Sequence, residues 1–218
     1  MEFSLNSIKH SKCAVIVAHP DDETLWAGGT ILMNPDNEWT IISTCRKHDP
    51  DRNPRYYAAL KILNATGDMG NLDDGPEQNP LEKRDVETTI LSLLKKTDYD
   101  LIMTHSTQGE YTRHRRHEEV AEAVLGLIES KRLTAKSLWM FAYEDGGREY
   151  LPKPIKHADQ FVFLPQDIWN KKYQIVTETY GFHQESWESR ATPRKEAFWA
   201  FHSAGGAKKW IQERSSVK

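Results

Sequence analysis

The sequence predicts an α/β fold, a single Rossmann-like three-layer domain with a mostly parallel sheet and a helical C-terminal extension. Short apolar runs rich in Val and Ile, typical of strands buried on both faces, alternate with segments whose apolar residues recur at helical spacing. This alternation indicates βαβ units and a parallel sheet with right-handed crossovers. Because no repeat or linker divides the chain, we expect residues 1–218 to form one domain, with residues 165–218 as its extension.

The expected strands and helices follow one another in order. The first strand, KCAVIVA, covers residues 12–18, and later strands are expected at residues 39–45, 100–104 and 138–143. The intervening helices are expected at residues 23–33, 54–64, 80–96 and 117–131, each with apolar side chains gathered on one face.

Two segments predict loops, and the C-terminal region predicts further helices. Residues 67–79 are rich in Gly, Asp, Asn and Pro, and residues 146–156 have a similar composition. Loops at the carboxyl ends of parallel strands commonly carry function. From Pro165 onward, the segments DIWNKKYQIVTETY and PRKEAFWAFH have helical character.

Composition excludes several classes of protein. Hydrophobic residues make up 38% of the 218 residues and include seven Trp, which is enough to build a core and excludes a chain disordered throughout. No apolar run approaches the ~20 residues of a membrane span, and the first residues lack a signal-peptide segment. A net charge of −3 disfavours a nucleic-acid partner. With only two cysteines, Cys13 and Cys45, we expect a cytoplasmic protein; its oligomeric state stays open.

Two polar clusters follow expected strands. AHPDDE, residues 18–23, lies where the first strand ends and a helix begins. A helix N-terminus explains Pro20 and the acidic residues but leaves His19 unexplained. The second cluster, THSTQGEYTRHRRH at residues 104–117, also leads from a strand end into a helix, and places His114 three residues before His117. Open α/β sheets hold their sites at such strand ends.

This combination of side chains suits zinc. Catalytic zinc commonly takes three protein ligands from His and Asp or Glu and leaves one position open. His19, Asp22 and one histidine of the second cluster can supply this set, which leaves a carboxylate and an imidazole for acid–base chemistry. HExxH is absent, and HRRHE is not the inverted motif HxxEH, so a metalloprotease is disfavoured.

AHPDDE followed by GEYTRHRRH resembles the LmbE-like, or PIG-L, N-acetylglucosaminyl deacetylase family, over about residues 12–131. Members are zinc-dependent amidases that remove acetyl groups from amino sugars and related conjugates. The resemblance implies three zinc ligands, which are His19, Asp22 and His117. It also implies that Asp21 is the general base and that His114 stabilises the oxyanion and protonates the leaving amine.

The resemblance implies further roles around these residues. Asp74 matches an aspartate that orients the catalytic histidine, and either Arg52 or Arg55, with Arg55 slightly favoured, matches an arginine that contacts substrate hydroxyls. Tyr111 matches an oxyanion or substrate contact, although this chain has one residue more between it and the first histidine. His105 either lines the pocket or hydrogen-bonds a metal ligand.

These observations predict a zinc-dependent hydrolase that removes an N-acetyl or N-acyl group from a small-molecule amino sugar or sugar conjugate. Two alternatives stay open. One is a zinc amidase that acts on a thiol conjugate or another amide, and the other is a non-catalytic sugar- or nucleotide-binding α/β module. Arg113, Arg115 and Arg116 add positive charge at the expected helix start, most simply as a solvated basic turn. Trp169, Trp187, Trp199 and Trp210 are candidates to stack on a sugar ring, although core packing is the better interpretation for Trp169 and Trp199, which lie in helical patterns.

Overall fold

A seven-stranded sheet forms the centre of this computed structural model, which describes residues 10–112 and 114–215. The strand order is β3-β2-β1-β4-β5-β9-β8. The first five strands are parallel, whereas β9 pairs antiparallel with both β5 and β8. The α/β fold with a mostly parallel sheet is therefore confirmed. The strands are β1 Lys12–Val17, β2 Glu38–Cys45, β3 Ala65–Leu72, β4 Asp98–Thr104, β5 Thr134–Phe141, β8 Gln160–Phe163 and β9 Lys195–Phe201.

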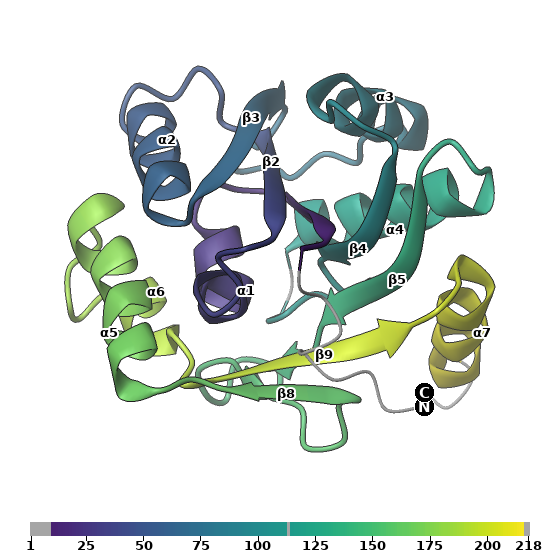
Figure 1. The fold of residues 1–218 in the computed structure, drawn as a ribbon. Coiled ribbons are helices and arrows are strands. Elements are labelled where there is room, and N and C mark those ends of the chain that lie inside the picture. The colour runs from purple at the N-terminus through teal and green to yellow at the C-terminus, as the bar shows by residue number, and fades with distance from the viewer. Residues whose placement is uncertain (1–9, 113, 216–218) are drawn as a thin grey trace.

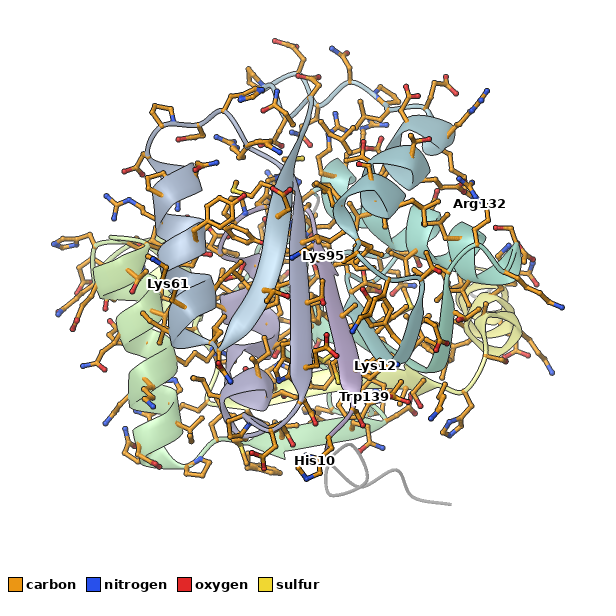
Figure 2. The ribbon with its side chains drawn as sticks, turned by 45° about the horizontal axis from the view of Figure 1, so that its top comes forward. His10, Lys12, Lys61, Lys95, Arg132 and Trp139 are labelled. Atoms are coloured by element: carbon orange, nitrogen blue, oxygen red, sulfur yellow. The ribbon has the colours of Figure 1, made fainter. Side chains whose placement is uncertain are left out.

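Helices cover both faces of this sheet (Figure 1). One layer holds α1 Asp22–Leu32, α2 Arg52–Ile62, α5 Gln166–Gln174, the π-helical turn η2 Ile175–Thr179 and α6 Trp187–Ala191. The other holds α3 Lys83–Leu93, α4 Arg115–Glu129 and α7 Ala204–Ser215. Figure 2 shows Lys61 of α2 and Arg132, just after α4, on opposite sides of the sheet. Buried apolar residues accordingly form two clusters, one beneath each layer.

The continuous apolar run in β1 has a direct structural reason. Residues 13–17 are all buried, because β1 lies between β2 and β4 and both of its faces carry helices. The four predicted strands correspond to β1, β2, β4 and β5, and the four predicted helices correspond to α1, α2, α3 and α4.

Two predicted segments differ from the structure. Residues 67–72, expected in a loop, belong to β3, and a Cβ on Gly67 would lie 1.7 Å from the backbone oxygen of Ile41 in β2. The glycine therefore allows a close strand contact and does not mark a turn. Residues 195–201, expected to be helical, form β9, whose continuous apolar run has no period that distinguishes strand from helix.

The other predicted loop, residues 146–156, is largely irregular. It contains the short strand β7 Lys153–Pro154, which pairs antiparallel with β6 Tyr143–Glu144. Among the described residues, no helix combines the length and the apolar character that crossing a membrane requires.

Candidate active site

The two polar clusters of the sequence meet at one edge of the sheet. The chain proceeds from β1 to β2 and β3 on one side, and then returns to β4 and β5 on the other, so the strand order reverses between β1 and β4. His19 lies just beyond β1 and His105 follows β4 directly. Such a switch point is where open α/β sheets place their ligands. Here it brings the Nδ1 atom of His19 within 3.2 Å of Nε2 of His117, which is 98 positions away in the sequence.

Three donor atoms converge at this point. Nδ1 of His19 and Oδ2 of Asp22 are 3.2 Å apart, and Nε2 of His117 lies 3.2 Å from the first atom and 3.3 Å from the second. Ligands about 2.0–2.1 Å from a tetrahedral zinc ion are separated by roughly 3.3 Å, so this triangle fits three of its four ligand positions. Wider groupings of possible ligands in the same cluster are His19, His114 and His117, and Asp22, His105 and His117.

Hydrogen bonds on the outer side hold these ligand atoms in place. Nε2 of His19 lies 3.0 Å from Oδ1 of Asp74, and Nδ1 of His117 lies 2.6 Å from Oε2 of Glu110. The indole N–H of Trp26 donates to Oδ1 of Asp22 at 3.1 Å. Each imidazole therefore donates its outer N–H to a carboxylate and directs its other nitrogen into the triangle, as metal-binding histidines usually do.

The charges at this centre favour a cation. Burial raises the pKa of the Asp22 carboxyl. His117 and His105 together outweigh this effect and lower the pKa well below its ordinary value. Burial lowers the pKa of His117, but Asp22 and Glu110 raise it to about 10. The carboxylates thus favour positive charge in the centre, such as that of a bound metal ion.

His105 supports the site from behind. Its side chain is fully buried, its Nε2 accepts the backbone N–H of Ala18 at 2.9 Å, and its Nδ1 lies 2.9 Å from Oε2 of Glu110. Both ring nitrogens are therefore engaged, so of its two expected roles the geometry favours hydrogen-bonded support over lining the pocket. Burial and the nearby His117 lower the pKa of His105, which fits a neutral ring.

Asp21 has an unusual backbone conformation at the start of α1. Its φ of 115° is rare for a residue with a side chain and costs about 1–3 kcal/mol. Its N–H donates to Oε2 of Glu23 at 3.0 Å, and Oε1 of this fully buried glutamate accepts the Tyr180 hydroxyl at 2.7 Å. Burial and Asp22 raise the pKa of the Asp21 carboxyl well above its ordinary value, although Arg52, at 3.3 Å, opposes the shift.

His114 lies between the ligands and the cavity. Its ring stacks on that of His117 with centroids 4.7 Å apart and meets the His19 ring edge-on at 4.5 Å. Its buried Nδ1 has no hydrogen-bond partner within the described part of the chain. Asp74 hydrogen-bonds His19, and the expectation that it orients His114 stays a prediction. Burial, His117 and His19 lower the pKa of His114 to about 3, so without a metal ion it is neutral near pH 7.

A small cavity of about 160 Å³ opens onto this centre. Seven of the residues predicted for the site line it, namely His19, Asp21, Asp22, Arg52, Asp74, Tyr111 and His114. Arg55 does not: it pairs with Asp51 at 2.7 Å and donates to the carbonyl oxygen of Thr179 at 3.2 Å. Of the two arginines considered, the structure thus places Arg52 at the cavity and directs Arg55 toward η2.

Four site residues were not predicted for these positions. Arg46 pairs with Asp74 at 2.6 Å, and Arg46, Trp187 and Glu188 line the cavity. Glu110 hydrogen-bonds both His117 and His105. It is the only carboxylate residue of the second motif, and that position could have identified it from the sequence. The sequence marks Trp187 only as one of several tryptophans that could stack on a sugar, because nothing local relates α6 to the strand ends.

The basic turn before α4 is only partly solvated. Arg115 is exposed, whereas Arg116 is fully buried, and it donates to the carbonyl oxygens of Asp73 at 2.5 Å and of Asn79 at 2.6 Å. Arg116 thus ties the segment that carries Asp74 to α4. Arg113 lies outside the described residues.

The sequence matches the model of the PIG-L family, described as GlcNAc-PI de-N-acetylase, over residues 14–128, more than half of the chain. A relative from Acanthamoeba polyphaga mimivirus, called uncharacterized protein L374, is 21% identical over 180 residues, which cover 74% of this chain and 75% of that protein.

Solved structures share the fold at low sequence identity. The N,N'-diacetylchitobiose deacetylase from Pyrococcus horikoshii superposes with a TM-score of 0.68 at 14% identity, covering 92% of this chain and 88% of its own. A deacetylase of the teicoplanin biosynthetic pathway gives 0.61 at 14% identity, covering 88% of this chain and 98% of its own. The deacetylase of the A40926 pseudoaglycone gives 0.58 at 13% identity, covering 89% and 99%.

Proposed function

The chain belongs to the PIG-L family, and from that premise we propose that it is a zinc-dependent hydrolase that removes an N-acetyl or N-acyl group from an amino sugar or sugar conjugate. The observation that carries the proposal is the triangle of donor atoms from His19, Asp22 and His117, with sides of 3.2 to 3.3 Å. Its dimensions and its nitrogen and oxygen donors suit zinc. When bound, zinc would act as a Lewis acid and lower the pKa of a coordinated water toward about 7.

Asp21 is the proposed general base. Its carboxyl lines the cavity beside the triangle, and its raised pKa makes it a better proton acceptor than an ordinary aspartate. The hydrogen bond from its N–H to Glu23 holds its backbone in place. The hydrogen bond from Arg52 to its carboxylate restricts the orientation of that side chain. In the proposed reaction Asp21 takes the proton from the water whose oxygen attacks the amide carbonyl carbon.

His114 is the proposed proton donor to the leaving amine. Cleavage of the C–N bond requires a proton on nitrogen, because an amine leaves poorly as an anion. The His114 ring lines the cavity on the side of His19 and His117. Its low pKa means that it must gain this proton during the reaction, and Asp21, which has taken a proton from the water, lines the same cavity.

An amino sugar is the proposed substrate class. The cavity carries acidic and basic hydroxyl-binding groups, Asp21, Arg46 and Arg52, beside the aromatic rings of Tyr111 and Trp187. Structural relatives include deacetylases of diacetylchitobiose and of a pseudoaglycone, which supports this class for the present chain.

Acetate release from a panel of N-acetyl compounds tests the proposal. The panel includes N-acetylglucosamine, its disaccharide, an N-acetylated thiol conjugate and a simple N-acetyl amine, each assayed with zinc and after chelation. We expect release from the amino sugars that is lost with chelator and restored by zinc. Release from the thiol conjugate alone would favour the amidase alternative, and absence of release from every compound would leave a binding module.

A further inference from the structure

The backbone of Asp21 is held in a conformation that residues with a Cβ rarely adopt. Strain of the kind implied by its φ of 115° persists only where surrounding contacts maintain it. Its carbonyl oxygen accepts the N–H groups of Thr24 at 2.9 Å and of Leu25 at 2.8 Å, and its own N–H donates to Oε2 of Glu23 at 3.0 Å. The direction in which the Asp21 side chain leaves the backbone therefore depends on what holds Glu23.

Tyr180 holds the other carboxylate oxygen of Glu23. The Glu23 side chain is fully buried, and its Oε1 accepts the hydroxyl of Thr24 at 2.6 Å and that of Tyr180 at 2.7 Å. Tyr180 directly follows the π-helical turn η2, and its N–H donates to the carbonyl oxygen of Ile175 at 2.9 Å. Such turns occur frequently at functional sites. Two hydrogen bonds thus connect the Tyr180 hydroxyl, through Glu23, to the backbone of Asp21.

Phe182 supports the same aspartate through its carboxylate. The Cζ atom of Arg52 lies 4.3 Å from the centroid of the Phe182 ring, and Nη1 of Arg52 donates to Oδ2 of Asp21 at 3.3 Å. Gly181, between the two aromatic residues, has a φ of 75°, which a residue without a Cβ adopts freely. The turn there allows Tyr180 to reach Glu23 while Phe182 packs on Arg52.

The segment that carries both aromatic residues is fixed to α2, the helix that carries Arg52. Nη1 of Arg55, also in α2, donates to the carbonyl oxygen of Thr179 at 3.2 Å, and η2 packs against this helix. Residues 179–182 lie outside residues 14–128, which match the family model. The C-terminal extension therefore contacts groups that hold Asp21.

We propose that Tyr180 and Phe182 are positioning residues for Asp21 in the hydrolysis. The proposal rests on the proposed function, in which Asp21 takes the proton from the attacking water. Neither aromatic residue lines the cavity at the metal centre, so each acts through a neighbour: Glu23 for the Asp21 backbone and Arg52 for its carboxylate. Because a displacement of about 1 Å at a reacting group can cost up to about 10²-fold in rate, loss of either contact should lower kcat.

Tyr180→Phe removes only the hydroxyl and tests the contact with Glu23. We expect kcat for acetate release to fall about 10- to 100-fold, with KM nearly unchanged and one zinc retained per chain. Tyr56→Phe is the matched control, because its buried hydroxyl donates to the carbonyl oxygen of Ile41, also at 2.7 Å. It should lose stability to a similar extent in urea and keep the wild-type kcat. Equal values of kcat in the two variants would overturn the role of Tyr180.

Phe182→Leu keeps an apolar side chain and tests the contact with Arg52. We expect kcat to fall about 2- to 5-fold, which corresponds to one partly exposed cation–π contact. Phe161→Leu is the control, because it removes a ring whose centroid lies 4.4 Å from Nζ of Lys195, away from the cavity. It should keep the wild-type kcat. A fall in both variants, or in neither, would contradict the role of Phe182.

Adding Tyr180→Phe to Asp21→Asn distinguishes positioning from a general structural effect. If Tyr180 acts only through the Asp21 carboxylate, its loss should lower the residual kcat of Asp21→Asn no further. A further fall as large as the one in the wild-type background would mean that Tyr180 acts on another group.

Crystal structures of zinc-loaded Tyr180→Phe and Tyr56→Phe test the positioning apart from turnover. We expect the φ of Asp21 to depart from 115° in Tyr180→Phe only. That result supports the positioning role even if the wild type deacetylates no compound, an outcome that would defeat only the proposed function. An Asp21 that keeps its backbone and carboxylate positions in Tyr180→Phe would overturn the proposal.

Discussion

Nδ1 of His117 lies 2.6 Å from Oε2 of Glu110, and both side chains are fully buried. The same carboxylate oxygen lies 2.9 Å from Nδ1 of His105. One oxygen thus receives two imidazole N–H groups, and the His117 ring is fixed with Nε2 facing His19 and Asp22. Glu110 therefore positions His117 at the proposed metal centre.

Glu110→Gln should weaken zinc binding. A neutral amide accepts more weakly than a carboxylate and places an NH₂ group near one of the two imidazoles, so the His117 ring loses its fixed orientation. We expect a 10- to 100-fold loss of zinc affinity, measured by competition with a chelating dye. Glu129→Gln changes an exposed glutamate at the end of α4 and should bind zinc as the wild type does. Equal affinity in all three proteins would remove Glu110 from this role.

The same carboxylate predicts how the metal-free protein responds to acid. Burial raises the pKa of Glu110, but His105 and His117 lower it to about 2, below its ordinary value of 4.5. A depressed pKa contributes stability that is complete above the ordinary value and is lost as the pH falls toward 2. Urea unfolding between pH 5 and pH 2 should therefore show a steeper loss in the wild type than in Glu110→Gln. Parallel losses would mean that another group controls the acid response.

Asp21→Asn and Asp22→Asn should separate catalysis from metal binding. Asp22 supplies an oxygen to the donor triangle, whereas the Asp21 carboxylate faces the cavity and Arg52. We expect Asp21→Asn to retain one zinc per chain and to lose about 10²–10⁴-fold in kcat. Asp22→Asn should lose zinc itself. Zinc content by mass spectrometry, together with acetate release, checks both variants, and substantial turnover by Asp21→Asn would exclude it as the base.

The central site could be predicted from the sequence because its residues lie in short motifs at strand ends. Chain positions bring His19 and Asp22 together with the histidines of the second motif, since parallel strands bring their carboxyl ends to one edge, and the family resemblance selects His117 among those histidines. Trp187 and Glu188 could not be predicted in this way. They reach the cavity from α6, where Trp187 packs against Trp26 and Tyr111, which are far away in the sequence. The hydrogen bond between Asp74 and His19 could not be predicted either, because it depends on side-chain geometry that the spacing of residues in the sequence does not determine.

The fold was predictable where the hydrophobic pattern was unambiguous. β1 and α4 have clear strand and helix patterns, whereas β9 is a continuous apolar run that gains its identity only by pairing with β5 and β8. β3 was missed because its glycines indicate a turn locally, although in the sheet they admit the neighbouring backbone.

Gly67→Ala should destabilise the protein. A Cβ at this position would lie 1.7 Å from the Ile41 carbonyl oxygen, and a backbone atom in a sheet cannot move aside without separating β2 from β3. We expect a loss of at least about 2 kcal/mol in the free energy of unfolding, measured in urea. Gly75→Ala is the matched control, because its Cβ would approach only Asp73 Oδ1, at 3.3 Å, and should cost less than about 1 kcal/mol. Similar losses in both variants would contradict the close-strand explanation.

The buried pair Lys172–Glu196 should matter more to stability than any exposed ion pair. The two groups are 2.6 Å apart with fully buried side chains, and Glu196 also accepts the N–H groups of Gly29 and Thr30 in α1, each at 2.7 Å. Burial lowers the pKa of Lys172, although Glu196 opposes the shift, so the lysine ammonium depends on the carboxylate beside it. Lys172→Met leaves the carboxylate uncompensated, and we expect a loss of about 3–5 kcal/mol.

A double-mutant cycle separates this pairing from general loss of packing. Lys172→Met combined with Glu196→Gln should lose less than the two single variants together, because the amide oxygen still accepts one of the two N–H groups of α1 and no unpaired charge remains. Lys136→Met breaks a pair with Asp100 in which the lysine is 80% exposed, and should cost less than about 1 kcal/mol. Additive losses in the cycle would mean that the two charges do not stabilise each other, and that Glu196 acts on α1 alone.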